Sequence, residues 1–213
     1  MRVVITGASR GIGAALAERY RARGDAVIGT ARSAAAQVSL DVTQPSSFAG
    51  LTEALGTGGV DLLVCNAGVY LDKGESIETG YGADLWAKTF AANVTGVFQT
   101  VQTALPNLRA SQGKIAIISS QMGSSTRAKG TSLIYRTSKA AVLNLGFNLA
   151  NGLRGDGIAV GIYHPGWVRT DMGGSDADIS VEDSADGLVA RFDALSLETT
   201  GCFETWDGRP HAH

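Results

Sequence analysis

A tyrosine and a lysine lie four residues apart in the segment IYRTSKAAV, residues 134–142. On a helix, positions i and i+4 share a face, so the phenol of Tyr135 and the ammonium of Lys139 would project into the same space. A tyrosine has an unperturbed pKa of about 10, and a nearby cation lowers that value by stabilising the phenolate. The pair is therefore a candidate for proton transfer, although surface packing would give the same spacing.

A glycine-rich turn, TGASRGIG at residues 6–13, supplies Gly7, Gly11 and Gly13. It follows an apolar run and opens a segment of helical periodicity. Glycines in this position permit a tight turn and let a phosphate approach the backbone N–H groups at a helix start. The context predicts a dinucleotide site, with a plain structural turn as the alternative.

The end of the second apolar run distinguishes between the two nicotinamide dinucleotides. An acidic residue there would hold a free ribose 2′-hydroxyl, whereas this chain has GTARS at residues 29–33, with Arg32 and no acid. Arg10 in the glycine turn could reach the same phosphate, and a guanidinium suits a phosphate in charge and geometry. The residues favour NADP, with NAD possible; the alternative is that both arginines are solvated surface residues.

Short apolar runs alternate with segments of helical periodicity along the whole chain. The seven runs are residues 2–6, 26–31, 38–42, 61–66, 114–119, 158–163 and 201–206. The helical segments are residues 13–22, 47–55, 84–105, 133–153 and 181–195, the last with Ser180 as its N-cap. This alternation predicts an α/β protein: a single-domain Rossmann fold whose doubly wound parallel sheet of about seven strands has helices on both faces.

Composition narrows the class of partner. With 213 residues and a formal charge of −2, the chain suits one domain, and neither a nucleic acid nor a membrane is indicated. We expect a domain over residues 1–207 and a tail at 208–213, whose histidines we interpret as disordered rather than metal-binding. Two cysteines and no secretory leader favour the cytoplasm, and no metal site is expected.

Several ordered motifs resemble those of the short-chain dehydrogenase/reductase family over essentially the whole chain. The matching segments are TGASRGIG at 6–13, LDVT at 40–43, CNAG at 65–68, AANVTG at 91–96, IISS at 117–120, YRTSK at 135–139 and HPGWVRT at 164–170. Cys65 stands where the family usually has asparagine. The spacing from Ser120 to Tyr135 resembles that of small bacterial members related to the C-factor developmental protein.

The resemblance implies a catalytic tetrad of Asn93, Ser120, Tyr135 and Lys139. Tyr135 would exchange a proton with the substrate oxygen, and Lys139, together with the oxidised nicotinamide, would lower its pKa. Ser120 would hold the substrate oxygen, and Asn93 would hold a water that relays protons. Because adjacent residues of a strand point to opposite faces, Ser119 is the alternative to Ser120.

The resemblance also implies a set of cofactor-binding and pocket residues. For the cofactor these are Gly7, Ser9, Arg10, Gly11, Ile12, Gly13, Arg32, Asp41, Val42, Asn66, Ala67, Gly68, Tyr135, Lys139, Pro165, Gly166, Val168 and Thr170. For the substrate pocket they are Gln121, Met122, Trp167 and Met172. We interpret His164 as a packed strand-end residue rather than a base.

The predicted function is NADP-dependent hydride transfer between the nicotinamide and a small carbonyl or alcohol substrate. A cofactor-binding regulatory or signalling protein of the C-factor type is the alternative, and it would have little use for the tetrad. An epimerase of the extended branch would need a further C-terminal domain. The long helical segments predict a homodimer or homotetramer, with Leu143, Phe147 and Leu149 either at the interface or buried inside one chain.

Overall fold

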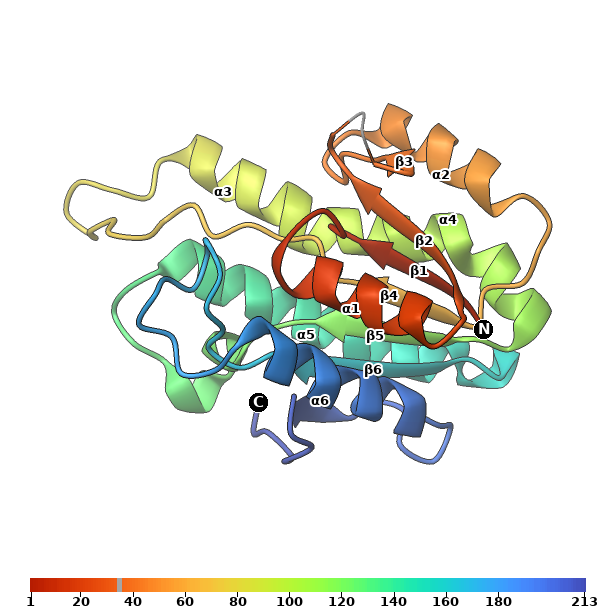
Figure 1. The fold of residues 1–213 in the computed structure, drawn as a ribbon. Coiled ribbons are helices and arrows are strands. Elements are labelled where there is room, and N and C mark those ends of the chain that lie inside the picture. The colour runs from red at the N-terminus through yellow and green to blue at the C-terminus, as the bar shows by residue number, and fades with distance from the viewer. Residues whose placement is uncertain (34–35) are drawn as a thin grey trace.

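Seven strands, all parallel, form one sheet in the order β3-β2-β1-β4-β5-β6-β7, which confirms the predicted fold class (Figure 1). The computed structural model describes residues 1–33 and 36–213. The strands are β1 (Arg2–Thr6), β2 (Ala26–Ala31), β3 (Val38–Ser39), β4 (Leu62–Cys65), β5 (Lys114–Ile118), β6 (Ala159–His164) and β7 (Phe203–Thr205). The helices are α1 (Gly11–Ala22), α2 (Phe48–Leu55), α3 (Ala83–Phe90), α4 (Gly96–Ser111), α5 (Leu133–Leu153) and α6 (Val181–Ala194).

The two faces of the sheet are covered by different helices (Figure 1). Successive residues of β1 alternate between the two cores, because side chains along a strand point to opposite faces. Val3 and Ile5 pack in the core that includes residues of α1 and α6, and Val4 packs in the core with α2, α4 and α5. No helix among residues 1–33 and 36–213 is long and apolar enough to cross a membrane.

Three expectations from the sequence are wrong in detail. The predicted strand 38–42 pairs only over β3, because Asp41 and the residues after it form a turn. The predicted helix 84–105 is two α-helices joined by a π-helical turn at Ala91–Thr95. Its second half continues through Pro106 to Ser111, since proline removes only one of the hydrogen bonds along a helix that is buried against the sheet.

The C-terminal residues are not a disordered tail. Gly208, with φ of 85°, turns the chain back along β7, and the N–H of His211 donates to the carbonyl of Phe203 at 2.8 Å. The ring of His213 lies 5.0 Å from that of Phe147. The division into residues 1–207 and 208–213 stays a prediction.

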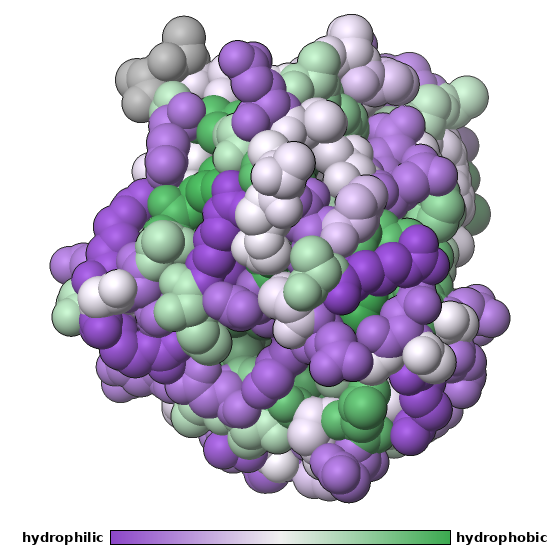
Figure 2. Space-filling model, turned by 90° about the vertical axis from the view of Figure 1, so that its right-hand side faces the viewer, coloured by the Kyte–Doolittle hydropathy of each residue, from purple (hydrophilic) through white to green (hydrophobic). Residues whose placement is uncertain are grey.

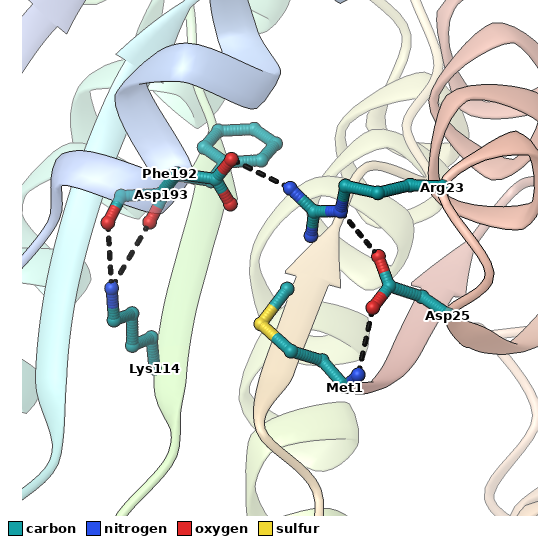
Figure 3. Close-up of polar contacts among 6 residues, drawn as sticks. All are labelled: Met1, Arg23, Asp25, Lys114, Phe192 and Asp193. Carbon is teal, nitrogen blue, oxygen red and sulfur yellow. Dashed lines mark hydrogen bonds and ion pairs between the residues drawn. The ribbon is translucent and has the colours of Figure 1, made fainter.

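A network of hydrogen bonds and ion pairs joins the amino ends of the strands to α6 (Figure 3). Asp25 accepts from the N-terminal amine at 2.7 Å and from Nε of Arg23 at 2.6 Å. Arg23 also binds Asp193 on α6 at 2.7 Å, and Nζ of Lys114 on β5 donates to the carbonyl of Asp193 at 2.8 Å. The face of the molecule in Figure 2 is largely hydrophilic with scattered hydrophobic spots. In open α/β sheets ligands bind outside the carboxyl ends of the strands, at the opposite end from this charge network.

Candidate active site

The glycine turn lies where the strand order reverses, between the carboxyl ends of β1 and β4. In doubly wound sheets a ligand binds in the crevice at this point. Gly7 and Gly11 have φ of +68° and +54°, which side-chain-bearing residues rarely adopt, and a Cβ at Gly13 would lie 2.3 Å from the Gly7 carbonyl oxygen. These glycines therefore keep the turn tight, as the predicted pyrophosphate cradle requires.

The end of β4 is tied to this turn by hydrogen bonds. Nδ2 of Asn66 donates to the carbonyls of Thr6 at 3.0 Å and Gly7 at 3.2 Å. The hydroxyl of Thr6 accepts from the backbone N–H groups of Asn66 and Ala67, both at 3.0 Å. Asn66 and Ala67 thus lie beside the glycine turn. Cys65 is buried in the core, and burial raises the pKa of its thiol to about 12, so it is an inert packing residue.

The predicted adenine side is formed by the ends of β2 and β3. Asp41 accepts hydrogen bonds from the backbone N–H and the hydroxyl of Thr43, at 2.9 and 2.7 Å. These two bonds are the main reason why the pKa of the Asp41 carboxyl is lowered. Arg32 is exposed, and its charge contributes to the same lowering of the Asp41 pKa. The carbonyl of Val42 lies against Gly96 of α4, where a Cβ would approach it to 2.7 Å.

Arg10 contacts the segment that follows β6. Its guanidinium forms an exposed ion pair with Asp171, and a Cβ on the neighbouring Gly11 would lie 3.4 Å from Cγ2 of Thr170. The glycine turn and residues 170–171 therefore face each other across the predicted phosphate site. Ser9 is exposed and Ile12 is half-buried in the same turn.

Tyr135 and Lys139 lie on one face of α5, as the spacing predicts, and both are buried. Nζ of Lys139 is 5.7 Å from the centroid of the Tyr135 ring and donates to the carbonyl of Ile118 at 3.0 Å. Burial raises the pKa of Tyr135 to about 12 and lowers the pKa of Lys139 to about 8. In the chain by itself the phenol is thus a protonated donor, and the lowering of its pKa by lysine and cofactor together stays a prediction.

The two serines after β5 have different partners. The hydroxyl of Ser119 donates to the backbone carbonyl of Lys139 at 2.9 Å and so fastens α5 to the sheet. The hydroxyl of Ser120 accepts from the N–H of Met122 at 3.1 Å and hydrogen-bonds with the Tyr135 side chain, which lowers the pKa of that phenol. This geometry favours Ser120 as the residue that faces a substrate.

Asn93 lies in the π-helical turn between α3 and α4 and is almost fully buried. Its Nδ2 donates to the carbonyl of Val69 at 2.9 Å and to the hydroxyl of Ser138 at 3.0 Å, and its Oδ1 accepts from the N–H of Val69 at 2.8 Å. Single π-turns are frequent at functional sites. The amide of Asn93 thus joins its own π-helical turn to Val69 and to Ser138 on α5. That Asn93 also holds a water that relays protons stays a prediction.

A cavity of about 390 Å³ opens at the carboxyl ends of β5, β6 and β7. Of the four predicted pocket residues, Gln121 and Trp167 line it, whereas Met122 and Met172 do not. The remaining lining residues are Arg127, His164, Gly166, Asp178, Ile179, Thr205, Trp206, Arg209, Pro210 and His211.

His164 is buried in this wall as a strand-end residue. Burial, followed by the charges of His211 and Arg127, lowers the pKa of the His164 imidazole to about 4, so it is neutral near pH 7. The predicted cofactor-binding residues Pro165 and Val168 lie on the same connection, whose residue Ile179 hydrogen-bonds to the backbone of Trp167 and Arg169.

Three further groups, two beside Tyr135 and one in the cavity wall, were not predicted from the sequence. The ring of Tyr70 stacks on that of Tyr135 with centroids 4.4 Å apart, and Asp72 accepts from the N–H of Tyr135. Trp206 lines the cavity. All three follow strands that end at this edge of the sheet, and that position is the only signal in the sequence that could have indicated them.

Comparison with known proteins decides the family. The family model described as short chain dehydrogenase matches residues 1–179. The chain belongs to the short-chain dehydrogenase/reductase family. It is 33% identical over 223 residues to the 1-hydroxy-2-glutathionyl-2-methyl-3-butene dehydrogenase of Rhodococcus sp. (strain AD45), covering 97% of this chain and 96% of that protein. It is 38% identical over 156 residues to the C-signal of Myxococcus xanthus, covering 71% and 92%.

Solved structures of the family superimpose over the whole chain. NADPH-bound carbonyl reductase from chicken fatty liver has a TM-score of 0.90 at 29% identity and covers 100% of this chain and 98% of its own. A carbonyl reductase from Pseudomonas aeruginosa PAO1 has a TM-score of 0.86 at 29% identity and covers 100% and 99%. This member of the short-chain dehydrogenase/reductase family is an NAD(P)-dependent oxidoreductase.

Proposed function

We propose that this chain reduces small aldehydes, ketones or ring carbonyls with NADPH, and that Tyr135 gives the proton to the carbonyl oxygen. The observation that carries the proposal is the protonated, buried phenol of Tyr135 with the Ser120 hydroxyl and the Lys139 amine beside it. The NADPH-bound carbonyl reductase among the structural relatives supports the choice of cofactor and substrate class.

Residues of the glycine turn and the ends of β2 and β4 would hold NADPH, with Arg10 and Arg32 at its 2′-phosphate. NADPH, when bound, supplies the hydride that reaches the carbonyl carbon. Ser120 donates a hydrogen bond to the carbonyl oxygen and holds it beside the phenol, and Tyr135 transfers its proton to that oxygen. The resulting phenolate is stabilised by the Lys139 ammonium, and its proton is restored from that side of the site.

The substrate class that we propose rests on the tetrad and on the carbonyl reductases among the structural relatives. The cavity of about 390 Å³ beside Gln121 and Trp167 is lined by none of the tetrad residues, and we propose it as space for the part of a small substrate that lies away from the carbonyl. The proposal includes a cytoplasmic location, because Cys65 and Cys202 are both free, and a homodimer or homotetramer.

The test is NADPH and NADH oxidation against a panel of aldehydes, ketones and quinones. We expect turnover with at least one carbonyl class and a lower KM for NADPH than for NADH. Tight NADPH binding with no turnover across the panel would contradict the reductase proposal.

That second outcome would favour another candidate, a cofactor-binding signalling protein. The similarity to the Myxococcus xanthus C-signal over 71% of the chain is the observation that supports it.

A further inference from the structure

A short segment after β4 contacts two members of the tetrad, Asn93 and Tyr135. In this clamp segment, residues 69–72, the backbone of Val69 forms two hydrogen bonds with the Asn93 side chain, at 2.8 and 2.9 Å. Tyr70 stacks on the Tyr135 ring, and its hydroxyl bonds with that of Ser132. Asp72 follows, so the segment links the cofactor side of the sheet to the start of α5.

The carboxylate of Asp72 is fully buried against the first turn of α5. It accepts from the N–H of Ile134 at 2.8 Å and from the N–H of Tyr135 at 3.2 Å. Among residues 1–33 and 36–213, none of the ion pairs includes Asp72. A buried carboxylate without a cation is costly, and these N–H groups with the positive end of the helix dipole provide its compensation.

Ordinary N-caps come from the residue next to the helix, but α5 is not capped in that way. Its N-cap position, Ser132, has φ of 55° and makes no side-chain bond to the helix N–H groups. Asp72, 62 residues before Ile134, takes this role from a different segment. The backbone of the catalytic tyrosine is therefore fixed by the clamp segment rather than by its own loop.

We propose that Asp72 is a positioning residue: by accepting from the N–H groups of Ile134 and Tyr135, it fixes the backbone from which the phenol of Tyr135 projects. This inference rests on the proposed function, in which Tyr135 is the proton donor.

The groups that face Tyr135 act in opposite directions. Ser120, from the end of β5, lowers the pKa of the phenol, whereas Tyr70 and Asp72, from the clamp segment, raise it in addition to the effect of burial. Lys139 lies on the same helix face. Removing the negative charge of Asp72 should therefore lower the pKa of Tyr135, so that phenolate forms at a lower pH.

The test is Asp72→Asn, which keeps the shape of the side chain and removes the charge. Tyrosine labelled with ¹³C at Cζ reports the phenolate directly, and the Tyr135 resonance is assigned by its absence in Tyr135→Phe. We expect the Tyr135 titration to move to lower pH in Asp72→Asn. Asp156→Asn, which removes a half-buried carboxylate paired with Arg109 at 2.9 Å, is the matched control and should leave the titration unchanged.

Kinetics give a second readout with any substrate found on the panel. We expect kcat to fall by about tenfold in Asp72→Asn while KM changes much less, because a small displacement of a proton donor affects the transition state more than binding. An unchanged Tyr135 titration and an unchanged kcat, together with lower thermal stability, would reduce Asp72 to a structural cap and overturn the proposal.

Two further arms keep the result decisive. If Asp72→Asn does not fold, hydrogen exchange of the unaltered chain replaces it: slow exchange at the N–H groups of Ile134 and Tyr135 is expected, and exchange as fast as at an exposed first turn would contradict the proposal. The titration needs no substrate, so a panel without turnover would count against the proposed function and leave the Asp72 result standing.

Discussion

Burial governs the protonation of the side chains that would do chemistry. The pKa of Tyr135 is raised to about 12 and that of Lys139 is lowered to about 8, both mainly because a charged form is poorly solvated there. Near pH 7 the phenol is therefore neutral and the amine is mostly charged. When a phenol next to an ammonium gives up its proton, the phenolate and the ammonium form a favourable ion pair. Carbonyl reduction requires proton transfer in this direction, from the phenol to the substrate oxygen.

The pH dependence of reduction should report Lys139. Below about pH 8 its ammonium is charged and stabilises the phenolate formed on proton transfer; above that pH the support is lost, so kcat should decline as pH rises through this range. Lys139→Met should lower kcat by about 100-fold and remove this decline. The measurement is kcat against pH, with exposed Lys88→Met as control, and an unchanged profile in Lys139→Met would contradict the role.

Arg32 should determine the preference for the phosphorylated dinucleotide. Charge-assisted hydrogen bonds contribute about 1.5–3 kcal/mol, so Arg32→Ala should weaken NADPH binding by about tenfold or more and leave NADH binding nearly unchanged. Fluorescence titration with both dinucleotides measures this, and Arg154→Ala is a control on the exposed end of α5. Equal losses for both dinucleotides would place Arg32 away from the 2′-phosphate.

At the scale of elements, most of the strands and helices could be predicted, because each has a regular hydrophobic pattern in the sequence. Apolar runs and helical periodicity located seven strands, and the Tyr135/Lys139 spacing placed both side chains on one helix face. The π-helical turn that holds Asn93 was not predictable, because its surroundings have the same apolar spacing as an α-helix.

Other features depend on contacts between distant segments. Asp72 is an ordinary loop residue in the sequence, and only the fold brings it to Ile134 in the first turn of α5, 62 residues later. The C-terminal residues looked like a polar tail, and their pairing with β7 depends on a turn at Gly208 and on the exposed edge that β7 offers. Sequence patterns report local periodicity, whereas these contacts are set by topology.

The close packing of the glycine turn leads to a prediction about Gly13. In Gly13→Ala the new methyl would meet the Gly7 carbonyl oxygen at 2.3 Å, so the turn must shift, and we expect at least about tenfold weaker NADPH binding and about 1–3 kcal/mol lower stability. Calorimetry and chemical unfolding measure the two effects. At Gly152 an added Cβ meets nothing within 4 Å, so Gly152→Ala should bind NADPH normally, and normal binding by Gly13→Ala would refute the cradle.

At the scale of the whole molecule, the charge network and the candidate active site lie at opposite ends of the strands. The amino-terminal edge carries the charge network of Asp25, Arg23 and Lys114, and the carboxyl edge carries the glycine turn, the tetrad and the cavity. Leu143 of α5 is buried in a small core with Ile162 and Phe203. Of the two explanations for its hydrophobicity, burial inside one chain is the one that the structure supports.

Assembly of several chains should therefore depend on other residues of the long helices. Phe98 lies on α4, one of the long helices through which the resemblance implies that chains pair, and it is 43% exposed. We expect the unaltered chain to sediment as a dimer or tetramer and Phe98→Glu to shift it towards monomer. Ile77→Glu, at a loop position that is 66% exposed, is the control and should not change the sedimentation. A monomer in the unaltered chain would contradict the predicted oligomer.

The most direct test of the central claim is Tyr135→Phe, which removes only the phenolic oxygen from the site. We predict that NADPH-dependent carbonyl reduction falls by about 10²–10⁴-fold in kcat, while the Kd for NADPH stays within about twofold. Tyr81→Phe, which removes a hydroxyl that donates to the Glu75 carbonyl at 3.1 Å in a loop, should keep full activity. If Tyr135→Phe reduced the same substrate as fast as the unaltered chain, Tyr135 would not be the proton donor and the account would be wrong.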